Sequence, residues 1–331
     1  MAQMKYFYEL TISSSPHAHS PVTTPTIMRD VLIALTPALL GSIYFFGFRA
    51  LMVTLVSAAA CVFFEWAYCR LMKTPVRVYD LSAVVTGVLL AFVCPVTIPY
   101  WTIILGDLFA IVLVKQLFGG IGKNFVNPAL AGRAFMFSWP VLMSTWVKVG
   151  FGNAAGLLST VDAVTAATPL AAMHQGQMPD ASLAELFLGN VGGCIGETSA
   201  LLLLLGFAYL LFRKVISPRI PLTFIATVAV LTFLFPQGNP RLGWMAAQVL
   251  SGGLMLGAIF MATDYVTSPV TKKGQIIFAV GCGVITVLIR YFGGYSEGVS
   301  YAILVMNACV VLLDKVGRPV KFGAPKKEAA K

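Results

Sequence analysis

The sequence predicts an all-α integral membrane protein, and three observations carry this prediction. Of 331 residues, 58% are hydrophobic and only 11% are charged, whereas a soluble domain usually has about a quarter charged residues. Several apolar runs approach the roughly 20 residues that a helix needs to cross a bilayer. Lys and Arg lie mainly between these runs, so the net charge of +10 indicates membrane topology and not nucleic-acid binding.

Ten apolar runs are expected to form transmembrane helices, with boundaries uncertain by a few residues. The runs are Val31–Phe46, Ala50–Cys69, Leu81–Val93, Trp101–Leu117, Val126–Met143, Thr198–Phe212, Ile220–Phe235, Trp244–Ala262, Gln275–Phe292 and Gly298–Leu313. An even number of crossings places both termini on the same side of the membrane.

The distribution of basic residues indicates which side of the membrane is cytoplasmic. With both termini in the cytoplasm, 18 of the 23 Lys and Arg residues fall inside. Outside fall only Arg49, Lys148, Arg241 and Arg290, and Arg133 lies within a span. Because cytoplasmic loops carry an excess of Lys and Arg, we expect cytoplasmic termini and an outward-facing loop at residues 144–196.

The two halves of the chain resemble each other weakly. Phe118-Gly119-Gly120 matches Phe292-Gly293-Gly294, although chance similarity between apolar segments is an alternative. Five helices per half is an odd number, so the halves would be inverted relative to each other, as in many transporters. The expected organisation is a cytoplasmic segment 1–30, a first repeat 31–143, an outer loop 144–196, a second repeat 197–313 and a basic cytoplasmic tail 314–331.

Proline follows the third and the eighth spans, in Cys94-Pro95 and in Ser268-Pro269. Proline interrupts helices, and broken helices at matching positions of two halves commonly line a substrate or ion path. We therefore expect broken helices near both positions.

The first motif that carries chemistry is FGGIGKNFVNPALAGRAF, from Phe118 to Phe135. Its glycines permit tight turns, and Lys123, Asn124 and Asn127 offer polar groups at the mouth of a span. A cytoplasmic loop with one Lys that reaches the membrane surface is the simpler interpretation. That interpretation does not explain Arg133, which is costly inside a bilayer and needs a partner.

The second motif is DAVTAATPL, from Asp162 to Leu170, in the expected outer loop. Taken alone, it predicts the start of a helix, with Thr168 as the N-cap and Pro169 as the first helical residue. The six cysteines contain no C-x-x-C pair, so we expect no metal site within this chain.

Together the two motifs resemble the RnfD/NqrB family, and the resemblance covers essentially the whole chain. In that family the last Thr of the second motif carries FMN through a phosphoester made by a dedicated flavin transferase. The resemblance implies that Thr168 carries FMN and that Asp162 and Thr165 fill the other fixed motif positions. Ala166 stands where the family often has Gly. The family also holds a noncovalent riboflavin, which we expect at the glycine-rich block near Lys123 and Asn127.

The resemblance implies a flavin-carrying electron-transfer subunit, not catalytic alone, in the bacterial cytoplasmic membrane. It would belong to an Rnf-type complex that couples ferredoxin and NAD to sodium or proton movement. Its partners would be RnfA, RnfB, RnfC, RnfE and RnfG. The implied fold is a ten-helix inverted repeat similar to that of urea transporters. Asn124 and Arg133 are expected to contribute to cofactor binding.

Acidic residues near or within spans are candidates for an ion path, because intramembrane carboxylates are usually functional. We select Asp107, Asp264 and Glu65, with Asp80 and Glu197 as further acidic residues near spans. A structural ion pair, for example with Arg133, is the alternative for each of them.

Three other functions stay open. An NqrB-type subunit of a sodium-pumping NADH:quinone oxidoreductase would carry similar motifs, but such chains typically have a longer N-terminal extension. A channel or transporter without redox chemistry would share the inverted repeat and the broken helices. A scaffold would use the polar motifs only to bind neighbouring subunits. Covalent flavin would distinguish the redox subunit from a channel.

Overall fold

The computed structural model describes residues 22–147 and 168–316, and within these ranges the regular elements are all helical. The first half contains α1 (Thr24–Phe46), α2 (Phe48–Leu71), η2 (Val78–Asp80), α3 (Ser82–Phe92), α4 (Tyr100–Leu108), η3 (Phe109–Gln116), α5 (Pro128–Met136) and α6 (Pro140–Met143). The second half contains α7 (Pro169–His174), α8 (Leu183–Leu188), α9 (Ala200–Phe212), α10 (Arg219–Leu234), α11 (Arg241–Leu250), α12 (Leu254–Leu256), η4 (Gly257–Met261), α13 (Lys272–Phe292) and α14 (Val299–Val316).

Four of the described helices are long and apolar enough to cross a membrane. They are α1, α2, α13 and α14, with 23, 24, 21 and 18 residues. A fifth span results if α11 and the helix that follows its 61° bend are counted together. The all-α membrane prediction is therefore confirmed, while the number of ten crossings stays a prediction.

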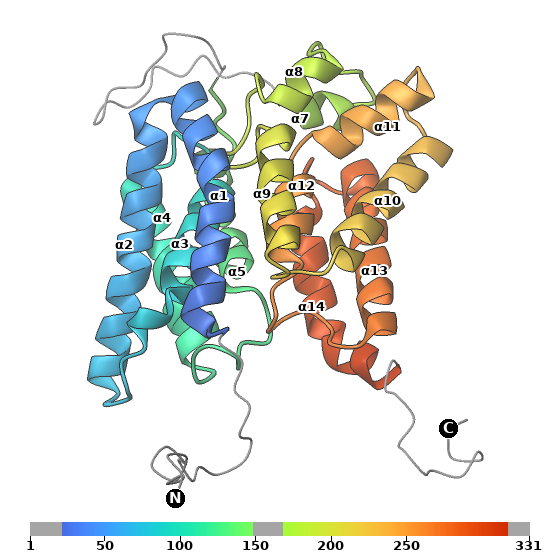
Figure 1. Cartoon of the computed structure of the whole chain (residues 1–331). Coiled ribbons are helices and arrows are strands. Elements are labelled where there is room, and N and C mark those ends of the chain that lie inside the picture. The colour runs from blue at the N-terminus through green and yellow to red at the C-terminus, as the bar shows by residue number, and fades with distance from the viewer. Residues whose placement is uncertain (1–21, 148–167, 317–331) are drawn as a thin grey trace, which may run out of the picture.

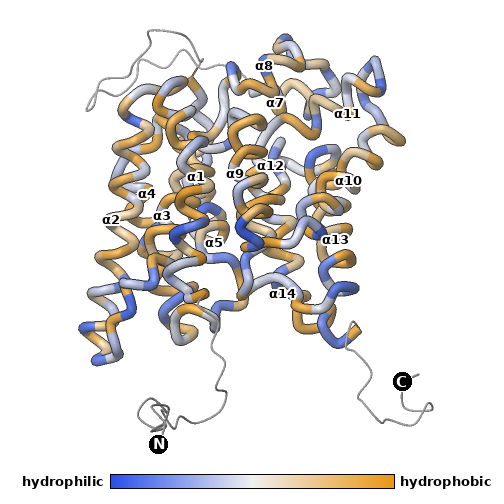
Figure 2. The backbone as a smooth tube through the Cα atoms, viewed as in Figure 1, coloured by the Kyte–Doolittle hydropathy of each residue, from blue (hydrophilic) through white to orange (hydrophobic). Residues whose placement is uncertain are grey.

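The outer surface of the long helices is apolar. Leu40 and Tyr44 of α1 are 62% and 63% exposed, and Phe63 and Trp66 of α2 are 56% and 48% exposed. Figure 2 shows hydrophobic residues along these helices, with hydrophilic residues where α2 ends and α13 begins. A soluble monomer rarely exposes so much contiguous apolar surface, so this surface suits contact with lipid.

The two halves pack through corresponding helices. α1 lies against α9 and α5 lies against α14, which joins the first and fifth elements of the predicted repeats. The start of α1 and the end of α14 lie at one end of the bundle, and α7 and α8 lie at the opposite end (Figure 1). This arrangement suits an even number of crossings. The inverted repeat and the assignment of one end to the cytoplasm stay predictions.

The break after the third span is present. α3 ends at Phe92, and the buried segment that follows leads through Pro95 to α4. Arg49 holds this segment, because its Nε donates to the carbonyl of Val96 at 2.8 Å and its Nη2 donates to that of Ile98 at 3.3 Å. Backbone carbonyls outside a helix need such donors at membrane depth.

Two predicted spans are corrected. The fifth is not one helix over Val126–Met143, because α5 ends at Met136 and α6 starts afresh at Pro140. Proline disfavours a helical conformation in the residue before it, and Trp139 has φ −115° and ψ 69°.

The eighth span breaks in its middle, and a non-helical segment that includes Pro269 also follows it, between Met261 and Lys272. α11 ends at Leu250, and the chain turns by 61° before it continues as α12 and η4. Gly252 lies in the turn with φ +68°, a conformation that residues with a side chain rarely adopt. The glycine pair Gly252-Gly253 therefore marks a break within the span, in addition to the predicted one near Pro269.

Candidate functional site

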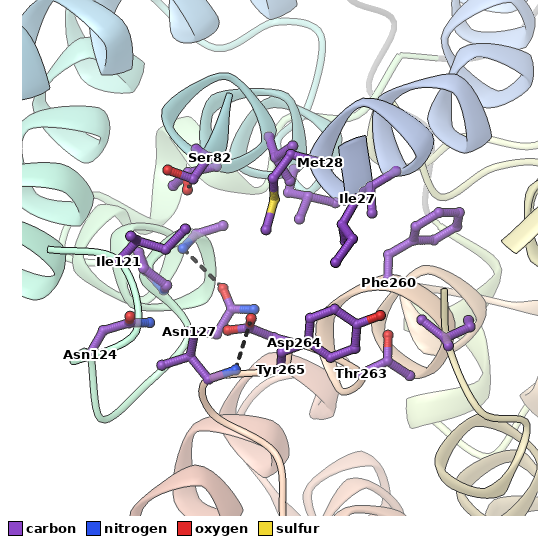
Figure 3. Close-up of a pocket in the computed structure, with 18 of the residues that line it drawn as sticks. Ile27, Met28, Ser82, Ile121, Asn124, Asn127, Phe260, Thr263, Asp264 and Tyr265 are labelled. Atoms are coloured by element: carbon purple, nitrogen blue, oxygen red, sulfur yellow. Dashed lines mark hydrogen bonds between the residues drawn. The ribbon is translucent and has the colours of Figure 1, made fainter. Parts of the chain in front are cut away.

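Two separate pockets contain most of the residues expected to bind cofactors. One lies where the start of α5 meets the end of η4, and we call it the Asn127 pocket (Figure 3). Its lining includes Ser82, Lys115, Asn124, Asn127, Asp264 and Tyr265. The other lies between the end of α5 and the start of α7, and we call it the Thr168 pocket. Its lining includes Arg133, Phe137, Thr168, Glu197, Tyr295 and Glu297.

Asn127 connects the two halves at the first pocket. Its Oδ1 caps α5 by accepting from the backbone amides of Ala129 at 3.0 Å and Leu130 at 3.3 Å. Its Nδ2 donates to the carbonyl of Met261, at the end of η4, at 3.3 Å. An Asn N-cap satisfies amides that a helix start leaves without partners. The second donor contact fixes the start of α5 to the second half.

The glycine-rich loop before α5 has the tight turns that the motif predicts. Gly119, Gly120 and Gly122 all have positive φ, between +86° and +106°. Within this loop the structure separates the two polar neighbours. Asn124 is buried and lines the pocket, whereas Lys123 is exposed and lies beside Gly119.

An ion pair closes the α2 side of the Asn127 pocket. Lys115 lies 2.9 Å from Glu65 Oε2, and both side chains are buried. Gln116 Nε2 donates to the other carboxylate oxygen of Glu65 at 2.9 Å, and Lys115 donates to Ser82 Oγ at 2.6 Å. Glu65, selected as an ion-path candidate, therefore has the structural pair that was its alternative, although with Lys115 and not with Arg133.

Asp264 and Asp107 make no ion pair with Arg133. Asp264 accepts from Thr267 Oγ1 at 3.0 Å and from the amide of Val266 at 3.4 Å, and it lines the Asn127 pocket. Asp107 is fully buried in α4, away from both pockets.

Arg133 is the centre of the Thr168 pocket. Its guanidinium is buried, forms an ion pair with Glu297 and lies 3.6 Å from Glu197 Oε1. Its Nη1 also donates to Ser300 Oγ at 2.6 Å, and its face lies over the ring of Phe137. The sequence requires a partner for this arginine, and the structure supplies two carboxylates.

Glu297 also binds the bend between α11 and α12. Its Oε1 accepts from the amide of Gly253 at 2.9 Å, while Oε2 binds Arg133. A second buried arginine, Arg290, donates to the carbonyls of Gln248 at 2.5 Å and Ser251 at 3.1 Å. The two arginines and two glutamates balance in formal charge, and their contacts extend from α5 to the bent helix.

Three residues of this cluster meet a simple geometric test for a metal site. The ligand atoms of Cys194, Glu197 and Glu297 lie within 4.8 Å of one another. Arg133, however, contacts all three, and its Nη2 lies 3.7 Å from Cys194 Sγ. The guanidinium thus supplies the positive charge that a metal ion would otherwise bring to these ligands.

Thr168 is the N-cap of α7, as the sequence predicts, and Pro169 is the first helical residue. Its Oγ1 accepts from the amide of Ala171 at 3.2 Å. His174 Nδ1 lies 2.6 Å from the carbonyl oxygen of Arg290, so α7 is fixed to α13. Asp162 and Thr165 lie outside the described residues.

α8 lies next to α7, and its start has a reciprocal cap. Ser182 Oγ accepts from the amide of Glu185 at 3.2 Å, and the Glu185 carboxylate accepts from the amide of Ser182 at 2.8 Å. The backbone hydrogen bond from Ser182, reinforced by its hydroxyl, lowers the pKa of the exposed Glu185 carboxyl.

Sequence reasoning missed the roles of Glu297 and Arg290. Glu297 immediately precedes the last apolar run. Arg290 was considered only as one of the basic residues assigned to the outer side. The signal that could have found Glu297 is Arg133 itself, since a buried arginine requires a nearby carboxylate.

Comparison with known proteins gives a consistent result. The model of the NQR2, RnfD, RnfE family matches residues 11–323. The D subunit of the Na⁺-translocating ferredoxin:NAD⁺ oxidoreductase complex of Acetobacterium woodii is 47% identical over 323 residues, covering 96% of both chains. The D subunit of the proton-translocating ferredoxin:NAD⁺ oxidoreductase complex of Clostridium ljungdahlii is 45% identical, covering 95% of this chain and 96% of that one. The D subunit of an ion-translocating oxidoreductase complex of Halorhodospira halophila is 38% identical, covering 94% of each.

Proposed function

Because the chain belongs to the NQR2, RnfD, RnfE family, we propose that it is the membrane-embedded RnfD subunit of an ion-translocating ferredoxin:NAD oxidoreductase complex. It carries flavin, passes electrons within the membrane part and contributes to ion movement, together with RnfA, RnfB, RnfC, RnfE and RnfG. The similarity of the chain to relatives named as D subunits, over almost their whole length, supports this proposal. It also favours RnfD over the NqrB-type alternative.

The covalent FMN is proposed at Thr168. The observation that carries this assignment is the shared pocket of Thr168 and Arg133, two residues that the sequence motifs single out separately. The hydroxyl of Thr168 accepts from the amide of Ala171, and a phosphoester oxygen could accept the same hydrogen bond. Phe137 and Tyr295 offer aromatic faces to a flavin ring, and Arg133 offers a positive charge.

When bound, the flavin supplies the electron-transfer chemistry, and the protein supplies placement and electrostatic tuning. Thr168 would hold the phosphate end, and a covalent bond there would prevent loss of the cofactor. Arg133 would act on a nearby flavin as part of a cluster in which Glu197 and Glu297 balance its charge.

The noncovalent riboflavin is proposed in the Asn127 pocket. Asn124 and Asn127 bring amide groups to its wall, and Phe260, Met28 and Ile27 are apolar parts of the lining. Small-molecule sites are typically apolar with a few placed polar groups. Lys123 is exposed and not among the lining residues, so we leave it out of this site.

The ion is not decided by similarity. The relative named for sodium and the relative named for protons are 47% and 45% identical to the chain. Asp264, in the wall of the Asn127 pocket, is a proposed member of the ion path.

The test of the proposal is covalent flavin on a denaturing gel. The chain is expressed with an active flavin transferase, and flavin fluorescence is measured in its band for the wild type, Thr168→Ala and Thr198→Ala. Thr198 lines the same pocket and is equally a buried threonine, so it is a matched control. We expect fluorescence in the wild type and in Thr198→Ala and none in Thr168→Ala.

If the wild-type band shows no flavin fluorescence while a known substrate of the same flavin transferase does, the flavin assignment is contradicted. The channel or scaffold alternatives would then be favoured. Fluorescence that persists in Thr168→Ala would place the attachment elsewhere.

A further inference from the structure

Asp107 is a carboxylic acid buried in the first half of the molecule. It lies in α4 with 0% of its surface exposed, and α4 packs against α2, α3 and α5. The α2 helix approaches α3 so closely at this level that a side-chain carbon on Gly87 would lie 2.7 Å from the backbone of Ala58. Water therefore has no access to Asp107 from this face.

The hydrogen-bond partners of Asp107 come from consecutive turns of α2. Its Oδ1 lies 2.7 Å from Ser57 Oγ and 3.2 Å from Cys61 Sγ. Its other oxygen, Oδ2, is buried and has no hydrogen-bond partner among the described residues. An ionised carboxylate would leave several lone pairs unsatisfied here, and this is costly away from water.

The hydrogen atoms can be counted at Ser57. Its Oγ lies 2.8 Å from the carbonyl oxygen of Gly87 and 2.7 Å from Asp107 Oδ1, but one hydroxyl has only one hydrogen. If Asp107 were ionised, one of these short oxygen pairs would have no hydrogen between them. If Asp107 carries a proton on Oδ1, it donates to Ser57 Oγ, and Ser57 donates to Gly87. Cys61 then donates its thiol hydrogen to Oδ1.

Asp107 has no cation, unlike the described acids that form buried ion pairs, and Asp264, which also has none, accepts a hydrogen bond at each of its oxygens. Glu65 pairs with Lys115, Asp30 with Arg213, and Glu197 and Glu297 with Arg133. Among the described residues, no Lys or Arg nitrogen makes an ion pair with Asp107. A buried charge without a counter-charge is strongly unfavourable.

We propose that Asp107 is held as the neutral acid and forms a proton-binding site with Ser57 and Cys61. Loading of this site transfers one proton from water outside the bundle to Oδ1, and unloading returns that proton to water. Nothing is oxidised or reduced.

Polar residues of α2 extend from the site toward one end of the bundle. Ser57, Cys61 and Glu65 are four residues apart on α2 and therefore share one face of that helix. Glu65 contacts Lys115, which also contacts Ser82, and the last two line the Asn127 pocket. Protons that exchange between Asp107 and this pocket would pass from Cys61 to Glu65 across one helical turn, which no hydrogen bond among the described residues bridges. The use of this exchange in ion transport rests on the proposed function, whereas the protonation of Asp107 does not.

Infrared spectroscopy of the full chain in lipid bilayers tests the site. A protonated aspartic acid has a carbonyl stretch that an ionised carboxylate lacks, and the Cys61 thiol stretch lies in a spectral region that is otherwise clear. At neutral pH we expect an acid band that is lost in Asp107→Asn and kept in Asp264→Asn. In Ser57→Ala this band should shift to higher frequency, because a hydrogen bond is lost. The thiol band, identified by its loss in Cys61→Ala, should shift in Asp107→Asn.

If Asp107→Asn fails to fold, the wild-type protein can be labelled with aspartate that contains a heavy carbon isotope. The label shifts the acid band if it comes from an aspartic acid, and the effect of Ser57→Ala on the band then assigns it to Asp107. An aspartate carboxylate band in place of the acid band would overturn the proposal, as would an acid band unaffected by both variants. Loss of the acid band when sodium is added at constant pH would also overturn the proposal, because it would show that a cation binds in place of the proton.

A second measurement uses the assembled complex in vesicles. We expect Asp107→Asn to lower the number of ions moved per electron at least tenfold while electron transfer continues. Unchanged transport together with the acid band would confine Asp107 to a proton site outside the transport path. Loss of electron transfer in every preparation, with the acid band present, would count against the proposed function and not against the site.

Discussion

The two pockets lie at different levels of the bundle and are built from different interactions. In the Thr168 pocket, one arginine and two glutamates from distant parts of the chain form a buried charged cluster. In the Asn127 pocket, neutral amide groups join the halves, and the charged pair of Lys115 and Glu65 lies within the first half. The difference shows that charge joins the halves at the Thr168 pocket, whereas a side-chain amide that donates to a backbone carbonyl joins them at the Asn127 pocket.

This difference predicts unequal sensitivity to substitution. A charged cluster is expensive to break, because a remaining partner stays buried without its counter-charge. A cap is cheaper to remove, because water or a relaxed helix end replaces part of its contribution. The variants below test this contrast in order of decreasing effect.

The largest effect is expected for Arg133→Met, which leaves Glu197 and Glu297 buried and unpaired. We expect a loss of about 3–5 kcal/mol in the free energy of unfolding. Denaturant unfolding in detergent, followed by tryptophan fluorescence, measures it. The triple variant with Glu197→Gln and Glu297→Gln should recover at least half of the loss. A cost under about 1 kcal/mol for Arg133→Met would contradict the ionic account of this pocket.

Lys115→Met should cost slightly less, about 3 kcal/mol, because it strands one carboxylate and Gln116 still donates to that carboxylate. Lys123→Met is the matched control in the same segment. It replaces an exposed lysine and should change the unfolding free energy by less than about 0.5 kcal/mol. Equal effects of the two variants would show that the buried ion pair of Lys115 does not determine the loss in unfolding free energy.

Asn127→Ala should cost about 1–2 kcal/mol through loss of the α5 cap. Asn127→Asp keeps the capping oxygen but loses the donor to Met261, so it separates the cap from the contact between halves. The same unfolding measurement applies to both. A loss as large as that of Arg133→Met would remove the contrast between the two pockets.

The smallest effect is a pH dependence at α8. The pKa of Glu185 is lowered in the folded state, so its contribution is present above the unfolded pKa and is lost as pH falls through the folded pKa. Hydrogen exchange of the α8 amides should therefore accelerate under acid conditions. In Glu185→Gln, which keeps the capping geometry without the charge, the protection should not change over that range. An unchanged wild-type profile would show that the carboxylate does not stabilise α8.

Local features of the site were predictable from the sequence. A Thr-Pro pair in a polar loop is enough to predict the N-cap at Thr168, because capping depends on neighbouring residues only. The need of Arg133 for a partner was also predictable, because burial of its charge follows from the apolar run around it.

Long-range features were not predictable. Glu297 lies 164 residues after Arg133, and nothing in either local pattern connects them. The break in the eighth span depends on the Gly252-Gly253 turn, which an apolar run hides, whereas Pro269 is the more obvious signal. The early end of α5 follows from Pro140, whose effect on Trp139 a hydropathy pattern does not register.

Glu297 uses its two oxygens for two different parts of the molecule, one for Arg133 on α5 and the other for the Gly253 amide in the bend. Rotation of the bent helix would pull this carboxylate away from the arginine, and loss of the ion pair would release the bend. Glu297 therefore couples the two halves directly, in addition to the contacts of Arg133 with Ser300 and of Asn127 with Met261. A change in charge inside the Thr168 pocket would be transmitted directly to the backbone of the second half.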